Sequence, residues 1–460
     1  MPASPTFLIT FLLTLAAMAW LALAGGRGVK VGSDFSLAGR RAGAWSVSGA
    51  IMGTLVGGAS TIGTAQLAFL FGLSAWWFTL GAGIACLLLG LFLAGPLREK
   101  EVETIPQFIG RYHGERARVA ASLFSSLGMF VHIVAQLLAG GAILSTLFGF
   151  GLLPATLISA ALIGLAVLAG GMKGAGSFGL AKLFLLYLTM AGAGVLAWRL
   201  AGGWSGLRTV FPPSPWFSLF GYGVREGVND LLSMLVGVIS TQTYLQAVFS
   251  ARDRRAARDG ALLSALIIPP LGLFGIAVGL YMRQVDPSLE SVKALPAFLQ
   301  AEFSPLFAGA AFATLLIAAV GTGAGLTLGV ATTLRVDVFG RLGLGRLPEL
   351  TLYRLLTLAV LVLALLLVLG NLGSAIMDWS FLSMGLRGAT LCLPLLAAVF
   401  LGSATPRRAG ALSIILAPTC VLAAGIAGWQ TIPPLYLGLG VSLTILLVGW
   451  WGGRWPVARS

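Results

Sequence analysis

Long apolar runs separated by short polar gaps dominate the pattern along the chain. A helix needs ~20 apolar residues to cross a bilayer, and by that rule the sequence predicts thirteen spanning helices. They lie at about 5–24, 44–72, 74–96, 117–148, 152–170, 176–201, 228–250, 259–282, 304–334, 351–370, 373–402, 408–428 and 433–452. The pattern therefore predicts an all-α, polytopic membrane protein.

Basic residues gather in every second gap between these segments. The basic gaps contain Arg27, Lys30, Arg40 and Arg41; Arg98 to Arg118; Lys173; the run ARDRRAARD at 251–259; Arg335 to Arg354; Arg407 and Arg408; and Arg454 and Arg459. The intervening gaps are neutral or carry acids such as Asp286 beside at most two basic residues each. Because cytoplasmic loops are enriched in Arg and Lys, we expect a plasma (inner) membrane protein with its N-terminus outside and its C-terminus in the cytoplasm.

An odd number of segments per half predicts an inverted repeat. With the first segment set aside, five segments start from the inside and the next five start from the outside, as in many secondary transporters. We expect an extra N-terminal helix and loop at 1–43, a first repeat at 44–201, an extracytoplasmic loop at 202–227, a second repeat at 228–402 and two C-terminal helices at 403–460.

The first segment of the first repeat has weak helix formers at its centre. The string GTLVGGASTIGT at 53–64 holds four glycines and four hydroxyl residues. In inverted-repeat transporters such a helix is broken, and its unwound backbone binds a cation. Close helix packing through small residues is the alternative. The partner segment at 228–250 carries a polar cluster from Ser240 to Gln246, which favours the broken-helix interpretation.

Composition narrows the function classes. The chain has 460 residues, of which 58% are hydrophobic and 10% charged, against about a quarter charged in soluble proteins. The net charge of +14 lies in the loops, so we expect no nucleic-acid partner. Two histidines, three cysteines within apolar segments and no phosphate-binding P-loop predict no metal cluster, no disulfide and no direct use of ATP. We expect no enzyme and no cofactor beyond a coupling ion.

Several strings resemble the sodium:solute symporter family. They are FSLAGRRAGAW at 35–45, GTAQLAFLFG at 63–72, TIPQFIGRYHGERAR at 104–118, GGMKG at 170–174 and ARDRRAARDGALLSA at 251–265. They occur in the family's order between residue 35 and about residue 340. The resemblance implies a LeuT-type fold, with one extra N-terminal and two extra C-terminal helices, and ion-coupled uptake of a small polar solute.

The resemblance also implies a sodium site between core helices one and eight. Its ligands would be backbone carbonyls of Gly53 and Val56 and, by matching 318–339 anchored on Asp337, the residues Ala318, Gly321 and Thr322. Oxygen ligands of this kind suit a hard cation. The family usually has two adjacent hydroxyl residues on helix eight, whereas this chain has Gly321 before Thr322, so one ligand oxygen is missing. The family's usual acid on core helix five is replaced by Gly179.

Lys182 follows one turn after Gly179, a few residues into its membrane segment. One interpretation is that the side chain snorkels to the cytoplasmic surface. The other places an ammonium at or near the sodium site. Because burial favours the neutral form of an amine, Lys182 could then load and release a proton. Sodium and proton coupling therefore both stay open.

Arg387 is a second intramembrane cation, near the middle of 373–402. A central arginine costs at least ~2.5 kcal/mol on insertion scales. Asp378 is about 13 Å away along a helix, too far for a local pair. Arg387 could bond exposed carbonyls or pair with a substrate carboxylate. The full set of candidate substrate-binding residues is Gln66, His132, Gln136, Ser240, Gln242, Tyr244 and Arg387.

These features predict a secondary active transporter that carries a small polar or anionic solute into the cell by sodium-coupled symport. Proton-coupled symport through Lys182 is the first alternative. A transporter-like membrane sensor is the second, although such sensors carry a long cytoplasmic signalling region, and this chain stops at Ser460, soon after its last predicted helix. A separate partner chain could supply that region. The expected partners are therefore the solute and the lipid bilayer.

Overall fold

The computed structural model describes residues 4–25, 40–100, 102, 104–170, 175–339, 349–427 and 432–452. Within these ranges the regular structure is helical, with one isolated bridge between Ala42 and Ala251. The all-α prediction is confirmed. Lys173 and most of the GGMKG string, as well as the basic residues Arg27, Lys30, Arg341, Arg346, Arg454 and Arg459, lie outside the described residues.

Most of the helices lie within the predicted apolar segments. They are α1 (Pro5–Gly25), α3 (Ala44–Leu55), α4 (Thr64–Phe71), α5 (Trp77–Leu88), α8 (Glu115–Phe148), α9 (Leu152–Gly170), α10 (Ala175–Leu200), α13 (Val224–Val238), α14 (Gln242–Phe249), α15 (Arg254–Val285), α17 (Pro305–Leu334), α18 (Glu349–Leu369), α19 (Ile376–Phe400), α20 (Arg407–Ile426) and α21 (Pro434–Gly452). Shorter helices include α6 (Ala94–Arg98), α7 (Ile105–His113), α11 (Gly203–Val210), α12 (Pro213–Trp216) and α16 (Ala294–Glu302).

Membrane crossing can be judged from length and apolar composition. Among the described residues, nine helical stretches are long and apolar enough to cross a membrane, or ten if the bent pair α13 and α14 is one span. Two shorter apolar helices cover Pro5–Leu21 and Leu152–Val167. The multi-pass membrane protein is thus supported, while the count of thirteen crossings, the inverted repeat, the domain limits and the orientation of the termini stay predictions.

The GTLVGGASTIGT string interrupts its helix. Helix α3 ends at Leu55, and Val56 at its C-cap has an extended backbone, with φ −88° and ψ 99°. The chain resumes after Gly57 and Gly58 as a π-helical turn, η2 (Ala59–Gly63), which continues into α4. A Cβ on Gly58 would lie 2.2 Å from the Ala139 Cβ, so the break fits only because these positions lack side chains.

The partner segment at 228–250 is also broken. Helix α13 ends at Val238, α14 begins at Gln242, and the two axes differ by 42°. Thr241, between them, has an extended backbone, with φ −92° and ψ 121°. The polar cluster that the sequence shows from Ser240 onwards therefore coincides with a break in the helix.

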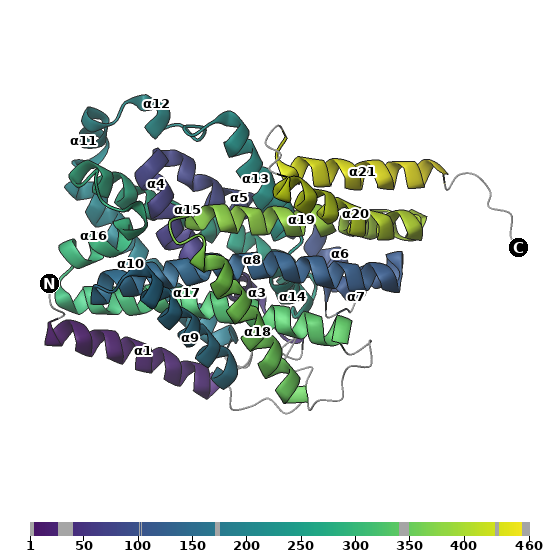
Figure 1. Cartoon of the computed structure of the whole chain (residues 1–460), viewed down its shortest axis with the longest axis horizontal. Helices are drawn as coiled ribbons and strands as arrows, with labels where there is room; N and C mark the ends of the chain where they lie inside the picture. The colour runs from purple at the N-terminus through teal and green to yellow at the C-terminus, as the bar shows by residue number, and fades with distance from the viewer. Residues whose placement is uncertain are drawn as a thin grey trace, which may run out of the picture.

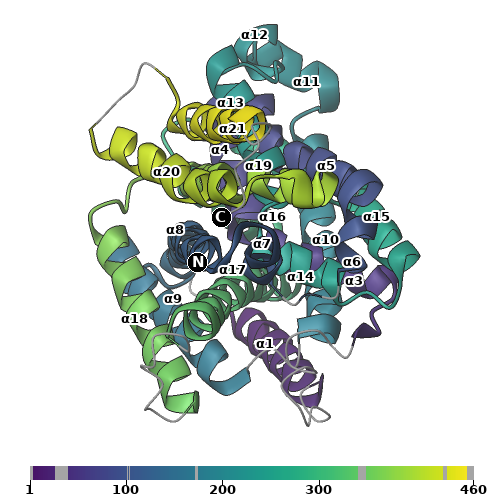
Figure 2. The same cartoon turned by 90° about the vertical axis from the view of Figure 1, so that its right-hand side faces the viewer.

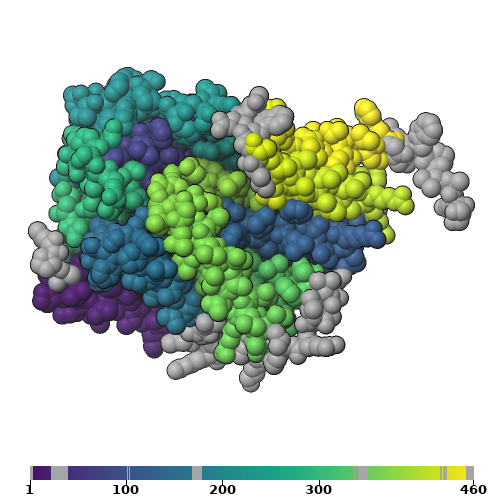
Figure 3. Space-filling view, in the orientation of Figure 1, coloured from purple at the N-terminus to yellow at the C-terminus, as the bar shows by residue number. Residues whose placement is uncertain are grey.

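Helices α8 and α17 pack along one another in the interior of the bundle. Figure 1 shows the helices running largely side by side, and Figure 2 looks along them, with α8, α17, α7 and α14 surrounded by α1, α18, α20 and α15. In the space-filling view the C-terminal pair α20 and α21 lies together at one side of the bundle (Figure 3). Both broken segments lie against the interior helices.

Candidate functional site

Lys182 reaches the break between α3 and α4, which together form the first core helix. Its ammonium nitrogen Nζ donates to the backbone carbonyl oxygen of Gly53 at 2.7 Å and to the hydroxyl Oγ1 of Thr322 at 2.8 Å. The side chain is only 2% exposed, so Lys182 does not snorkel to the surface. Two of the residues predicted to bind sodium are therefore bonded to an ammonium group, which takes oxygen ligands as a sodium ion does.

Close packing of α10 on α3 brings Lys182 to this position. A Cβ added to Gly53 would lie 3.5 Å from the Cα of Gly179, and one added to Gly179 would lie 3.4 Å from the carbonyl oxygen of Gly49. The two backbones meet at glycines, at the position where the family usually has an acid. Because the lysine is one turn further along α10, its side chain can extend across α3 towards α17.

The other predicted sodium ligands lie on the same segments. Val56 is the fully buried C-cap residue of α3. Ala318 is buried one turn before Thr322 on α17, and Gly321 is partly exposed. Gly57, which the predicted ligand set lacks, lies in the same place: a Cβ there would be 2.7 Å from Thr322 Oγ1 and 2.8 Å from Gln136 Oε1.

Arg387 is fully buried on α19. Its Nε donates to the Ser383 carbonyl oxygen at 3.2 Å, and Nη2 donates to the Ser383 hydroxyl at 2.7 Å and contacts the Met384 sulfur at 3.3 Å. Nη1 has no hydrogen-bond partner. No carboxylate in the described part of the chain forms an ion pair with Arg387; in particular, Asp378 does not.

Glycine on α8 makes room for Arg387. A Cβ on Gly128 would lie 2.3 Å from the Cγ of Arg387. Ser383 fixes the local geometry, since its hydroxyl donates to the Gly128 carbonyl oxygen at 2.7 Å while it accepts from Arg387. Gly128 and Ser383 were not among the residues predicted from sequence, because a lone glycine or serine in an apolar segment is usually a packing residue.

His132 and Gln136 lie one turn apart on α8 and connect the surroundings of the two cations. His132 Nδ1 is 3.4 Å from Arg387 Nη2, and the Gln136 Oε1 accepts from the Gly58 backbone N–H at 2.9 Å. Both side chains are fully buried, and His132 Nε2 and Gln136 Nε2 have no partner. One face of α8 therefore runs from the break in the first core helix to Arg387.

The remaining substrate candidates differ in their surroundings. Tyr244 is fully buried on α14 and is close enough to Arg387 for electrostatic interaction. Ser240 is fully buried in the break before α14. Gln66 Oε1 accepts from the Ile376 backbone N–H at 3.0 Å, so it satisfies the first turn of α19.

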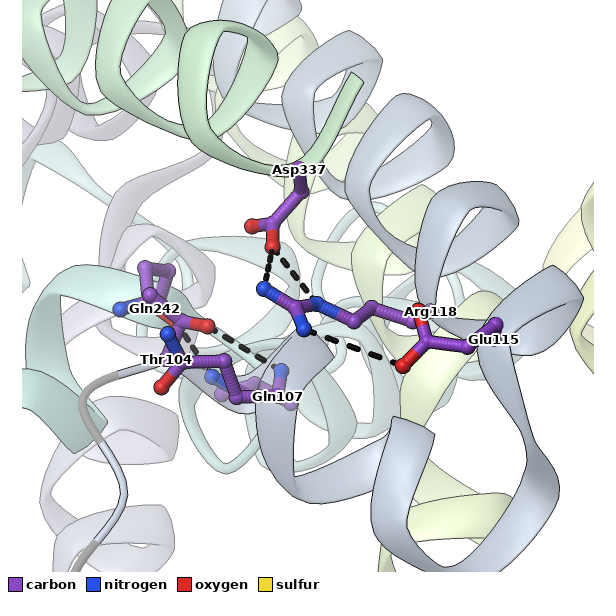
Figure 4. Close-up of polar contacts among 7 residues, drawn as sticks. Thr104, Gln107, Glu115, Arg118, Gln242 and Asp337 are labelled. Carbon is purple, nitrogen blue, oxygen red and sulfur yellow. Dashed lines mark hydrogen bonds and ion pairs between the residues drawn. The ribbon is translucent and has the colours of Figure 1, made fainter. Parts of the chain in front are cut away.

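Gln242 belongs to a polar network beside the start of α8. Its Oε1 accepts from the Ile105 backbone N–H at the start of α7, at 2.7 Å. In the same region Arg118 donates from Nε and Nη2 to Asp337 Oδ1, at 2.8 and 2.6 Å, and lies 3.9 Å from Glu115 (Figure 4). By the predicted orientation both sets of contacts lie at the inner face, where the first joins α14 to α7 and the second joins α8 to the π-helical turn after α17.

A cavity of about 290 Å³ opens at the end of α4 and the starts of α13 and α19, away from the Arg118–Asp337 pair. It is lined by Leu67, Phe71, Tyr222, Glu226, Asn229, Asp230, Asp378 and Phe381. Tyr222 donates to Asp230, and burial together with that carboxylate raises the pKa of Tyr222, so the phenol keeps its proton. A second cavity, of about 360 Å³, is lined mostly by apolar residues of α10, α11 and α15 and includes neither buried cation.

Comparison with known proteins agrees with the helical arrangement. Residues 35–193 match the sequence model of the sodium:solute symporter family. An uncharacterised symporter of Bacillus subtilis, YwcA, is 24% identical over 242 residues, which are 50% of this chain and 47% of that protein. The aligned part thus spans about half the length of this relative.

Solved structures extend the likeness over the whole chain. A sodium-coupled sialic acid symporter, solved substrate-bound and outward-open, has a TM-score of 0.75, 17% identity and coverage of 98% of both chains. Mhp1, a nucleobase-cation-symport-1 family transporter, has a TM-score of 0.62, 15% identity and coverage of 93% of this chain and 95% of its own. These likenesses show the fold, and with the family match they confirm the predicted resemblance to the sodium:solute symporter family and support a secondary transporter.

Proposed function

We propose that this protein is a secondary transporter that moves a small polar or anionic solute into the cell and couples that movement to protons through Lys182. The observation that carries the proposal is the position of the Lys182 ammonium, bonded to Gly53 and Thr322 at the break in the first core helix. A group on the chain itself thus takes the place that the resemblance assigns to a sodium ion.

The ammonium links three helices through one side chain. Lys182 extends from α10, Gly53 is on α3, and Thr322 is on α17. A hydrogen bond to a charged group contributes about 1.5–3 kcal/mol, and that contribution falls when the amine loses its proton. Protonation therefore strengthens the contact between α3 and α17, and deprotonation weakens it, which is the differential interaction that a coupling ion must supply.

Coupling to the solute follows from the shared surroundings of the break. Gly57 lies against both Thr322 and Gln136, and Gln136 bonds Gly58. A change in the α3–α17 contact therefore alters the backbone that Gln136 holds. By reciprocity, a solute that favours one arrangement of this region raises the proton affinity of that arrangement by the same factor.

Sodium-coupled symport is the second candidate, favoured by the family match and by the sodium-coupled sialic acid symporter that shares the fold. An ammonium and a sodium ion repel one another strongly in a low-dielectric interior. Sodium binding at this position would therefore require Lys182 to be neutral or to turn away from Gly53 and Thr322. The two candidates differ in the cation that Gly53 and Thr322 bind during transport: the Lys182 ammonium in the first and a sodium ion in the second.

Thermal unfolding of the purified protein tests the proposal without a known solute. The melting temperature Tm would be measured in sodium and in potassium at constant ionic strength, across pH. A ligand present at 100 times its Kd stabilises the folded protein by about 2.7 kcal/mol. We expect no sodium-specific rise in Tm, and a pH-dependent component that disappears in Lys182→Gln. A sodium-specific rise that disappears in Thr322→Ala would instead establish the sodium candidate.

A further inference from the structure

Three buried side-chain nitrogens at and around Arg387 have no hydrogen-bond partner, and all three are donors; the Tyr244 hydroxyl interacts with Arg387 and can both accept and donate. An arginine can only donate, so its contact with His132 Nδ1 makes that nitrogen an acceptor and leaves the ring proton on Nε2. The Gln136 amide is oriented by Gly58 N–H, which needs an oxygen, so its NH₂ group is the unbonded end. Arg387 Nη1, His132 Nε2 and Gln136 Nε2 are therefore all unsatisfied donors.

These donors are fully buried, which makes the absence of acceptors costly. A buried polar group without a partner destabilises the folded protein, and a charged group does so more strongly. Arg387 stays charged, since a guanidinium is not deprotonated in proteins. The Ser383 carbonyl oxygen is the single backbone carbonyl that Arg387 bonds in the described chain, so bonding of exposed carbonyls accounts for one of its five N–H groups.

We propose that this cluster, made of Arg387, His132, Gln136 and Tyr244, is the binding site for a carboxylate of the transported solute. A carboxylate supplies one negative charge and about four acceptor positions. It can pair with Arg387 while it accepts from the neighbouring donors, including the Tyr244 hydroxyl. This inference names the substrate class. It rests on the proposed transport function only because it takes the bound carboxylate to be part of the transported solute.

The cluster is closed towards the acidic cavity, which is the 290 Å³ cavity lined by Glu226, Asp230 and Asp378. Arg387 lies six residues after Phe381 on α19, about 9 Å further along the helix axis, and Phe381 lines the cavity. Between the cavity and Arg387, α13 packs closely on α19. A Cβ on Gly237 would lie 2.5 Å from the Met384 Cβ, and one on Gly388 would lie 2.0 Å from Val236 Cγ2. Entry of the solute therefore requires α13 and α19 to separate.

The first test needs no ligand. If Arg387 is kept for a ligand, its unpaired charge destabilises the empty protein, and Arg387→Met should have a Tm equal to or above that of the parent in a low-salt zwitterionic buffer. If Arg387 is a structural group, the same variant loses stability. A fall in Tm of more than a few degrees that Arg387→Lys prevents would overturn the proposal.

The second test uses defined probes on the purified full chain. Formate, acetate, propionate, lactate, benzoate and the zwitterion alanine would be compared with their uncharged amides or alcohols and with chloride, at equal ionic strength. We expect at least one carboxylate to raise the parent's Tm by roughly 2 °C or more, its amide to have no effect, and Arg387→Met to lose the response. The exposed Arg408→Met on α20 is the matched control and should respond like the parent.

Two results would overturn the assignment. The first is the absence of a response to every carboxylate in the set. The second is an equal response to chloride alone, which would make the cluster a resident inorganic anion site. Because both tests are made at equilibrium without a gradient, they are independent of the coupling ion. Carboxylate binding that survives in Lys182→Gln would stand even if proton coupling failed, and proton coupling would stand if no carboxylate bound.

Discussion

Lys182 and Arg387 are both buried cations without a carboxylate partner in the described chain, yet their surroundings differ. The Lys182 ammonium uses two of its three N–H donors on oxygens supplied by the protein, Gly53 and Thr322. The Arg387 guanidinium leaves Nη1 unbonded and lies beside further donors. An ammonium can also shed its charge, whereas a guanidinium cannot.

Two unlike sites allow one protein to hold two cations in a low-dielectric interior. The first site is complete within the chain, and its charge can be removed by loss of a proton, so it suits a coupling role. The second site is incomplete and permanently charged, so its partner must come from outside.

Arg118 is an arginine whose partner, Asp337, the chain itself supplies. Loss of that partner should destabilise the protein, whereas loss of the unpaired Arg387 should not. Asp337 is fully buried, and its Oδ1 accepts from two nitrogens of Arg118. Asp337→Asn strands the guanidinium and should lower the free energy of unfolding by about 3 kcal/mol, measured by Tm. The double variant with Arg118→Met should recover part of this loss. A single variant as stable as the parent would contradict the comparison.

Gly57 separates the two sites, and a side chain there should disturb both. Its added Cβ would lie 2.7 Å from Thr322 Oγ1 and 2.8 Å from Gln136 Oε1. Overpacking of this kind costs about 1–3 kcal/mol, so Gly57→Ala should weaken the pH response and the carboxylate response roughly tenfold or more. Gly53→Ala is the control, because its Cβ has ordinary contacts and its carbonyl is kept. Independent sites would leave one response intact in Gly57→Ala.

Thr322→Ala should affect coupling more than recognition of the solute. Thr322 Oγ1 is one of two acceptors for Lys182, and loss of one bond to a charged group is worth roughly a tenfold change. We expect the proton concentration for half-maximal uptake in proteoliposomes to rise about tenfold, while the KM for the solute changes less. Thr327→Ala, which removes a hydroxyl that bonds its own helix at Gly323, is the matched control. Equal changes in both quantities would show that Thr322 serves both sites.

The fold was largely predictable from sequence because apolar runs and glycine-rich interruptions report directly on helices and breaks. The limits of the helices follow the apolar segments, and the glycines and hydroxyls of GTLVGGASTIGT mark the interruption after Leu55. Lys182 was recognisable as unusual because a lysine in an apolar segment is costly. Its partners could be narrowed only with the family resemblance, which placed Gly53 and Thr322 together.

The detail of the sites could not be predicted, because it depends on contacts between distant segments. Nothing in the sequence distinguishes Gln242, whose Oε1 bonds the start of α7, from Gln136, which reaches the break after α3. Gly128 and Ser383 are inconspicuous in sequence, yet one leaves room for Arg387 and the other orients it. Periodicity identifies a helical face, but it does not identify the residue that the face meets.

On the proposed route of entry, the acids that line the 290 Å³ cavity affect the rate at which solutes arrive. Those of the acids Glu226, Asp230 and Asp378 that are ionised create a negative potential in this cavity, which enriches small cations there and depletes simple anions relative to bulk solution. A zwitterion experiences far less of this depletion than a simple anion of the same size. Added salt screens the potential within about 10 Å at 0.1 M, so uptake of a simple carboxylate should accelerate with ionic strength while uptake of a zwitterion changes little.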